Sequence, residues 1–398
     1  NLKLDKKLIK YWEPKCVVNK NMSKNESIEG ARHHLIKSLK YRMRSDVPLA
    51  FCLSGGVDSG ALVSIAKKNL NQNISTFSII DSDSRYNELD NINIVNNDLN
   101  CVSHLIKLES KKNIFFDRMK QLVKQHDGPI ATLSYYIHSF LSEEISKEGF
   151  RVSISGTGAD EIFTGYYDHY LLHLQTVKDT NHFQKCLDDW KKYILPIIRN
   201  DNLKDPFYYI KDKHDRRLVF EEDFNLKKYS TKELNSEYKE KVYCEELLRN
   251  RMLNELFFEV VPVILKHDDL NSMHYSIENR SPYLDRDLLE FSLSIPPYYL
   301  IEDGFQKKIL RDATENTLND TVRLNRQKKG FNASINSILE FSNPEIFEYI
   351  FNKKSPISEF INLEKLKKDL NKTSIPNHIS KFIFSLIGTK IFLENNFK

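Results

Sequence analysis

The sequence Ala50-Phe51-Cys52-Leu53-Ser54-Gly55-Gly56-Val57-Asp58-Ser59-Gly60 begins as an apolar run and ends abruptly in glycines and an acid. Residues 49–53 read as a strand and residues 61–70 as a helix with one apolar face, so the glycines mark a strand–turn–helix corner. Glycine allows backbone N–H groups to approach a ligand, and a new helix presents unpaired N–H donors. The corner is therefore a candidate phosphate site. In the alternative interpretation, Asp58 and Ser59 only cap the helix.

Composition indicates an ordinary globular protein. The chain has 398 residues, of which 40% are hydrophobic and 29% charged, and a formal net charge of +4. This length allows one large domain or two moderate ones, and the even charge balance argues against a nucleic-acid or membrane partner. Five widely spaced cysteines without a Cys-x-x-Cys pair fit reduced thiols better than disulfides or zinc. We therefore expect a cytoplasmic protein.

Strands and helices alternate along the first 170 residues. The predicted strands are 49–53, 74–80, 102–106 and 151–155, and the predicted helices are 27–43, 61–70, 86–97, 113–126 and 132–146. This order predicts an α/β fold with a doubly wound parallel sheet, whose ligands bind at the carboxyl ends of the strands. The chain beyond residue 170 has a helical pattern, and we interpret the charge runs between about 176 and 250 as solvated faces.

A second corner follows the predicted strand 151–155. It reads Ser155-Gly156-Thr157-Gly158-Ala159-Asp160-Glu161, with glycines at a strand end, then an acid, then a helix. Two such corners in one parallel sheet would face one cleft. An N-cap is the alternative role for Asp160.

Five motifs together resemble one enzyme family. Ser-Gly-Gly-Val-Asp-Ser is not a Walker loop, because it lacks the Gly-x-x-x-x-Gly-Lys-Ser/Thr spacing, and it resembles the pyrophosphate loop of ATP pyrophosphatases. The others are the second corner, Met-x-x-Ser-x-Glu-x-Arg-x-Pro-x-Leu-Asp at 273–285, Lys-Lys-Ile-Leu-Arg at 307–311 and Arg-Gln-Lys-Lys-Gly-Phe at 326–331. Their order is similar to that of the asparagine synthetase family, over residues 28–331. The resemblance implies the synthetase domain of a glutamine-dependent enzyme, with an ATP-pyrophosphatase (adenine nucleotide α-hydrolase-like) fold and a large helical C-terminal part.

This resemblance also implies a reaction and a site. Such enzymes adenylate a carboxylate with ATP, release pyrophosphate, and transfer ammonia or another amine to form an amide. Asp58 and Asp160 would hold Mg²⁺, for which carboxylates are suitable ligands, while Lys328 and Asp160 would act in catalysis. The implied ATP-binding residues are Ser54, Gly55, Gly56, Asp58, Ser59, Ser78 and Gly156.

Two further charged groups have alternative interpretations. Lys307 and Arg311 lie one helical turn apart and could either face the phosphates or form a solvated stripe. Glu278, Arg280 and Asp285 are better interpreted as a structural ion-pair turn than as chemistry.

The sequence departs from the family at two positions. Asparagine synthetases have Glu where this chain has Thr157, and the stretch around Ala131 lacks the arginine expected to hold the carboxylate of aspartate. A neutral hydroxyl cannot supply a carboxylate's charge. Both departures weaken the case for aspartate, and relatives of the family amidate other acids, including sugar uronates.

The resemblance also divides the chain. Residues 1–26 would be a linker from an upstream glutaminase domain, 27–170 the ATP-binding α/β core, 171–252 a charged helical insertion, and 253–398 the helical remainder with the basic catalytic loop. The expected partners are a small carboxylate, an ammonia donor and a glutaminase domain or subunit, with a homodimer as a candidate assembly. A tRNA-modifying pyrophosphatase and a catalytically silent nucleotide-binding scaffold are the alternatives.

Overall fold

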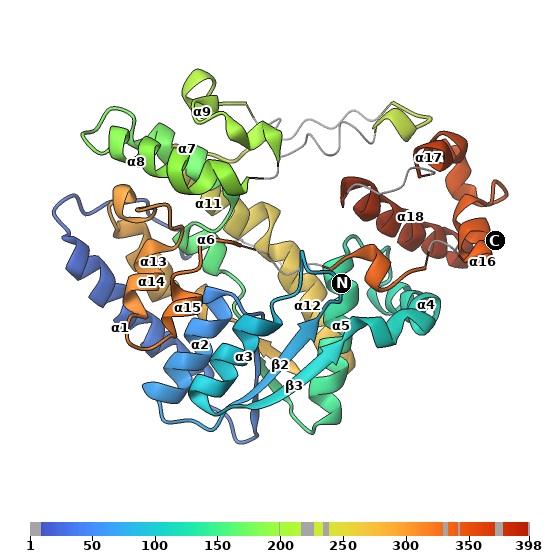
Figure 1. Ribbon diagram of the computed structural model, residues 1–398, viewed down its shortest axis with the longest axis horizontal. Helices are drawn as coiled ribbons and strands as arrows, with labels where there is room; N and C mark the ends of the chain where they lie inside the picture. The colour runs from blue at the N-terminus through green and yellow to red at the C-terminus, as the bar shows by residue number, and fades with distance from the viewer. Residues whose placement is uncertain are drawn as a thin grey trace, which may run out of the picture.

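A parallel sheet forms the centre of the protein, as a computed structural model shows for residues 9–198, 200–215, 227–233, 239–328, 333–340, 343–370 and 377–396 (Figure 1). Its strands are arranged in the order β3-β2-β1-β4-β5, and every neighbouring pair is parallel. The strands are β1 (Leu49–Cys52), β2 (Ser75–Ile80), β3 (Val102–Lys107), β4 (Val152–Ile154) and β5 (Glu278–Arg280). The predicted α/β, doubly wound parallel fold is confirmed.

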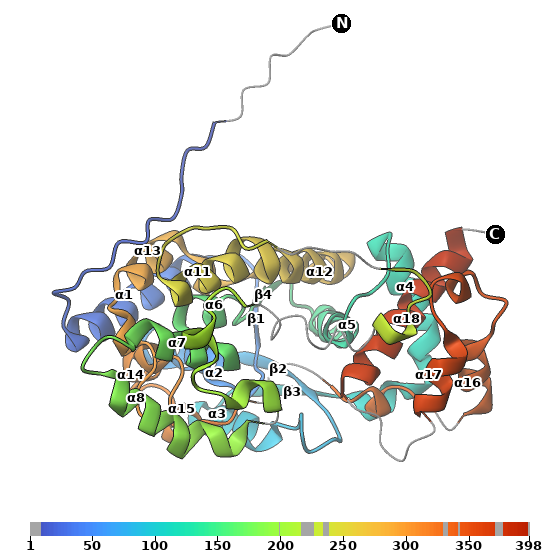
Figure 2. The same cartoon turned by 90° about the horizontal axis from the view of Figure 1, so that it is seen from above.

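Helices cover both faces of this sheet (Figure 2). In the first half of the chain they are α1 (Lys24–Arg42), α2 (Val57–Lys68), α3 (Leu89–Leu99), α4 (Phe115–His126), α5 (Leu133–Lys147), α6 (Ala159–Phe163), α7 (Tyr167–Val177) and α8 (Phe183–Asp189). Those that follow are α9 (Tyr208–Lys211), α11 (Leu247–Asn254), α12 (Val261–His274), α13 (Arg286–Ser294), α14 (Lys308–Ala313), α15 (Asp320–Arg323), α16 (Pro344–Phe351), α17 (Leu363–Leu370) and α18 (Asn377–Asn396).

The sheet separates two hydrophobic clusters. Successive strand residues point to opposite faces, and in β1 Phe51 packs with α1, α2 and α3 whereas Ala50 packs with α4, α5 and α18. A strand buried on both faces reads as a continuous apolar run, because neither face is exposed to water. This burial explains why β1 was visible in the sequence.

The strand β5 was not predicted. We had interpreted Glu278, Arg280 and Asp285 as an ion-pair turn, but residues 278–280 pair in register with β4. The ion pairs are present, since Arg280 Nε lies 2.7 Å from Glu278 Oε1 and Arg42 Nη1 lies 2.9 Å from Asp285 Oδ2. The strand has no apolar alternation because it forms the edge of the sheet, so its sequence carries no strand signal.

Most of the charged side chains that the structure describes between residues 176 and 250 are exposed, as the charge runs predicted. Arg249 of α11 is an exception, because it is only 1% exposed and donates from Nη2 to the Ile295 carbonyl oxygen at 2.9 Å. Trp190 and Tyr209 of the same region are also buried in the cluster around α7. At the other end of the chain, the Trp12 indole N–H donates to Glu290 Oε1 at 2.6 Å, which attaches the extended N-terminal segment to α13.

Among the described residues, none of the helices combines the length and apolar character needed to cross a bilayer.

Helix α7 buries a histidine in a neutral form. His173 is 1% exposed, and burial lowers its pKa to about 4, although a hydrogen bond with the Pro297 backbone opposes this shift. An unfolded histidine has a pKa near 6.5. Between these two values the unfolded state binds a proton that the folded state does not, so falling pH destabilises the protein through this group.

We therefore predict that His173→Leu makes the stability less dependent on pH. Between pH 7 and pH 5, the free energy of unfolding of the wild-type protein should fall by about 2 kcal/mol more than that of His173→Leu. Urea unfolding of both proteins at the two pH values measures this difference. The exposed His214, replaced by Gln, provides the control. An unchanged pH dependence in His173→Leu would show that folding does not lower the pKa of His173.

Candidate active site

The first glycine corner joins β1 to α2. Gly55 has φ +83°, and a Cβ there would lie 2.9 Å from Glu88 Cβ, so this turn requires glycine. Gly56 is the N-cap of α2, and the cap receives no side-chain hydrogen bond. Asp58 and Ser59 therefore do not cap the helix, which makes that alternative wrong. The backbone N–H groups at the start of α2 remain directed toward the cavity that residues 52–59 line.

The second corner joins β4 to α6 and contacts the first. Gly158, not Asp160, is the N-cap of α6, so the N-cap alternative for Asp160 is also wrong. A Cβ on Gly156 would lie 3.3 Å from both Asp58 Cβ and Ser59 N, which shows how closely the two corners approach. They meet because β1 and β4 are parallel neighbours on either side of the point where the strand order reverses, the usual ligand position in such sheets.

A lysine connects the two acidic residues of these corners. Lys307 Nζ lies 2.6 Å from Asp58 Oδ2 and 2.5 Å from Asp160 Oδ1. Burial alone would lower the pKa of Lys307, which is 4% exposed, but Asp160 and Asp58 raise it. Lys307 precedes α14 and has a left-handed backbone with φ +55°, an uncommon conformation for a residue with a side chain. The interpretation of Lys307 as part of a solvated stripe is therefore wrong.

Lys328 reaches the same acid from the basic loop. Its Nζ lies 2.6 Å from Asp160 Oδ1, donates to the Gly165 carbonyl oxygen at 2.9 Å, and is 4.7 Å from the centre of the Tyr166 ring. Burial opposes the ionisation of Asp160, but Lys307 and Lys328 hold its pKa well below the usual value. The structure thus brings Asp58, Asp160 and Lys328 together.

Two arginines extend this basic wall of the cavity. Arg311 is 8% exposed, donates from Nε to the Gln306 carbonyl oxygen at 2.8 Å, and has a pKa that burial lowers to about 10. The guanidinium carbon of Arg326 lies 3.9 Å from the centre of the Phe305 ring. Both line the cavity. The neighbouring Lys329 lies outside the described residues.

Sequence reasoning left the role of Lys307 open and missed Glu161 as a site residue, although Glu161 lies inside the second corner motif. Glu161 is 3% exposed and accepts a hydrogen bond from the Tyr166 hydroxyl. Burial, followed by the charge of Asp160, raises the pKa of Glu161 to about 7. Its place directly after Asp160 was the available signal.

Ser78 is the predicted ATP-binding residue that does not line the cavity. It is buried within β2, and its neighbours Phe77 and Ile79 line the cavity instead. The two faces of a strand alternate, so the side chain of Ser78 points away from theirs. A contact between Ser78 and ATP remains a prediction.

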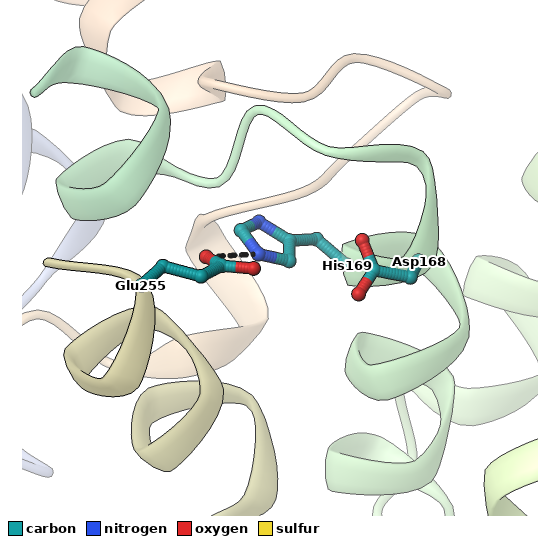
Figure 3. A group of neighbouring side chains, drawn as sticks. All are labelled: Asp168, His169 and Glu255. Carbon is teal, nitrogen blue, oxygen red and sulfur yellow. Dashed lines mark hydrogen bonds and ion pairs between the residues drawn. The ribbon is translucent and has the colours of Figure 1, made fainter. Parts of the chain in front are cut away.

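A second acidic cluster lies behind the site. Asp168, His169 and Glu255 place one potential ligand atom each within 4.8 Å of one another (Figure 3). However, Arg251 Nε lies 2.9 Å from Glu255 Oε1 and 3.7 Å from Asp168 Oδ2, and His169 Nε2 lies 2.9 Å from Glu255 Oε2. Arg251 and His169 already pair with these carboxylates, so we assign an ion-pair network to this cluster. The His169 ring packs edge-on against Tyr166, whose ring lies beneath Lys328.

The cavity matches the dimensions and charge of a nucleotide with a divalent cation. Its volume is about 780 Å³, and both glycine corners line it together with Asp58, Asp160, Lys307, Arg311, Arg326 and Lys328. Asp58 and Asp160 offer the oxygen ligands that Mg²⁺ prefers. Lys307 bridges both carboxylates, so its ammonium group would have to give way to a metal ion.

Comparisons with known proteins agree with these motifs. A family model described as asparagine synthase matches residues 30–382. Asparagine synthetase [glutamine-hydrolyzing] 1 of Bacillus subtilis is 27% identical to this chain, and the match covers 76% of this chain and 49% of the relative. The amidase chyE of Penicillium rubens is 24% identical, and its match covers 81% of this chain and 55% of the relative. The chain spans about half the length of these relatives. The U34-tRNA thiolase NcsA from Methanococcus maripaludis covers 66% of this chain and 86% of its own, at 11% identity and a TM-score of 0.28, a value that supports no conclusion.

We predict that Gly165→Ala disrupts the junction of the two corners. A Cβ at this position would lie 1.6 Å from Asp160 Oδ1, so the carboxylate would have to move away from Lys307 and Lys328. The variant should lose about 1–3 kcal/mol of stability, as is common when a packed site is overfilled, and this loss can be measured by urea unfolding. Gly128→Ala is the matched control, because its nearest neighbour would be 3.8 Å away. Equal stability of the two variants would contradict the arrangement described for Asp160.

Proposed function

Because the chain belongs to the asparagine synthase family, we propose that it acts as an ATP-dependent, AMP-forming amide ligase. It would adenylate a carboxylate, release pyrophosphate, and transfer ammonia or another amine to the acyl group. The observation that carries this proposal is the convergence of Asp58, Asp160, Lys307 and Lys328 where the two glycine corners meet. The amidase name of the Penicillium relative is consistent with carbon–nitrogen chemistry in related proteins.

The residues divide the binding of ATP between backbone and side chains. Ser54, Gly55, Gly56, Ser59 and Gly156 would hold phosphate oxygens through N–H and hydroxyl groups, as helix N-termini and glycine turns do elsewhere. The apolar wall formed by Leu53, Phe77 and Ile79 would accept the adenosine part. Asp58 and Asp160 would hold Mg²⁺, which supplies positive charge to the phosphates when it is bound.

The lysines would act on charge that develops during the reaction. Negative charge grows on pyrophosphate as it leaves, and pre-positioned cations stabilise that charge without reorganising. Lys328 extends from the basic loop to Asp160 and can shift toward a phosphate with a small change of its flexible side chain. Lys307 would make the same kind of contact once Mg²⁺ occupies the two carboxylates.

The residues near the second corner bear on which carboxylate is the substrate. Thr157 lines the cavity and accepts a hydrogen bond from the Ser155 hydroxyl at 3.3 Å, so this position offers hydroxyl groups rather than a carboxylate. Ala131 lines the cavity where an arginine was expected. Neither feature supports aspartate, and a non-aspartate acid such as a sugar uronate is the alternative substrate.

The nitrogen source is also a proposal. The Bacillus relatives carry glutamine-hydrolyzing in their names and are about twice as long as the matched region. We propose that a glutaminase domain or subunit supplies ammonia to this chain in the cytoplasm.

Pyrophosphate exchange into ATP, measured with a panel of carboxylic acids, tests the ligase reaction. We expect exchange with at least one acid. The exchange rate should fall roughly a hundredfold or more in Asp58→Asn, Asp160→Asn and Lys328→Ala. The two Asp variants remove charge that would hold Mg²⁺ on the phosphates, and Lys328→Ala removes a cation that would stabilise the departing pyrophosphate. Asp90→Asn and Lys124→Ala change exposed residues outside the cavity and serve as controls.

Other outcomes would favour the other functions. Exchange that requires tRNA would support a tRNA-modifying pyrophosphatase. ATP binding without exchange for any acid would support a catalytically silent scaffold. Full exchange in all three site variants would overturn the site assignment.

A further inference from the structure

The cavity has a second end, whose chemistry differs from that of the phosphate corners. Helices α5 and α12 pack side by side and contribute Tyr135, His138, Leu141, Ile264, Asp268 and Ser272 to its lining (Figure 2). Among the described α5 and α12 residues that line this end, none is lysine or arginine. Outside these two helices, Lys381 of α18 also lines the cavity, so only the wall formed by α5 and α12 carries no basic side chain.

A buried carboxylate lies at this end. The side chain of Asp268 is 6% exposed, and His138 Nδ1 lies 2.7 Å from Asp268 Oδ1. Removing a carboxylate from water is costly unless charged or polar groups compensate for the lost solvation. Among the described residues, His138 is the side chain that provides this compensation for Asp268.

Two neighbouring side chains of the cavity carry no charge. Burial, followed by the charge of Asp268, raises the pKa of Tyr135 to about 12, and the same causes raise the pKa of Cys52 to about 12. Both groups are therefore neutral at physiological pH. Because Nδ1 of His138 faces Asp268, the other ring nitrogen, Nε2, lies on the opposite edge of the imidazole.

We propose that this end of the cavity binds an ammonium or amine group, with Asp268 as its counter-charge and His138 as a hydrogen-bonding partner. The opposite charges at the two ends would orient the substrates. A carboxylate would be attracted to the basic wall and repelled by Asp268, whereas an ammonium group would be attracted to Asp268. This inference rests on the proposed ligase function, in which an amine meets an activated acid in one cavity.

Such a group has two possible sources. It belongs either to the amine that is transferred or to an amino group on the acid. The chemistry of recognition is the same in both cases, so kinetic measurements have to separate them.

Binding can be measured without turnover. Protein labelled with [¹³Cε1]histidine is titrated with methylammonium chloride, and the His138 signal is assigned by its loss in His138→Gln. We expect a saturable shift of this signal that sodium chloride at equal ionic strength does not produce. Asp268→Asn should raise the methylammonium concentration at half-saturation by about tenfold or more, because it removes a charge-assisted hydrogen bond.

The adjacent acid provides a matched control. Asp269 is exposed and does not line the cavity, so Asp269→Asn removes the same charge one residue away and should bind methylammonium as the wild type does. Asp268→Glu, which keeps the charge, provides a second variant if Asp268→Asn unfolds. An absent or non-saturable His138 shift in the wild type would overturn the proposal, as would equal weakening in Asp268→Asn and Asp269→Asn.

Turnover then identifies the source. An increase of about tenfold or more in KM for the amine in Asp268→Asn, with unchanged pyrophosphate exchange, assigns the site to the transferred amine. An increase in KM for the acid during exchange assigns it to an amino group on the acid. Unchanged KM values for both would contradict the inference even if exchange itself confirmed the ligase, and failure of exchange in the wild type would count against the proposed function alone.

Discussion

The site depends on one ammonium group held between two carboxylates. Lys307 is buried, and its Nζ contacts Asp58 of α2 and Asp160 of α6, which follow different strands of the sheet. Without a cation between them, the two carboxylates would repel each other. Removal of one partner from a buried ion pair typically costs about 3–5 kcal/mol, because the remaining charge is left uncompensated. Lys307 therefore joins the two corners, and the space between the two carboxylates is a binding position for a positive charge.

Close approach of backbone supports that interaction. Gly156 brings the second corner against Asp58 and Ser59, and Gly165 leaves room for the Asp160 carboxylate, where any Cβ would overlap it. The αL conformation of Lys307 directs its side chain from the start of α14 into the same position. Strained or sparsely populated backbone is retained where the surrounding structure over-determines it, which is common at functional sites.

Two groups of charged residues line the cavity. Lys307, Arg311, Arg326 and Lys328 line the end near the glycine corners, and Asp268 with His138 lies between α5 and α12. Behind the basic end, the network of Arg251, Glu255 and His169 supports Tyr166 and the loop around it, so the residue beneath Lys328 is itself held in place. A reaction between an anionic and a cationic substrate would benefit from this arrangement, because each reactant is stabilised at its own end.

The sequence by itself determined the parallel α/β sheet, both glycine corners and the meeting of Asp58 with Asp160, because buried parallel strands and glycine turns leave local patterns. It also placed Lys328 near them through a recognisable motif, although the roles of these residues remain proposals. Only the tertiary structure decided that Lys307 joins Asp58 across 249 positions, that His138 pairs with Asp268 across 130, that polar residues 278–280 form an edge strand, and that Arg249 is buried. Each of these depends on contacts between distant segments. A lysine, an acid or an arginine looks the same in sequence whether water or another segment surrounds it, so no local pattern can report such contacts.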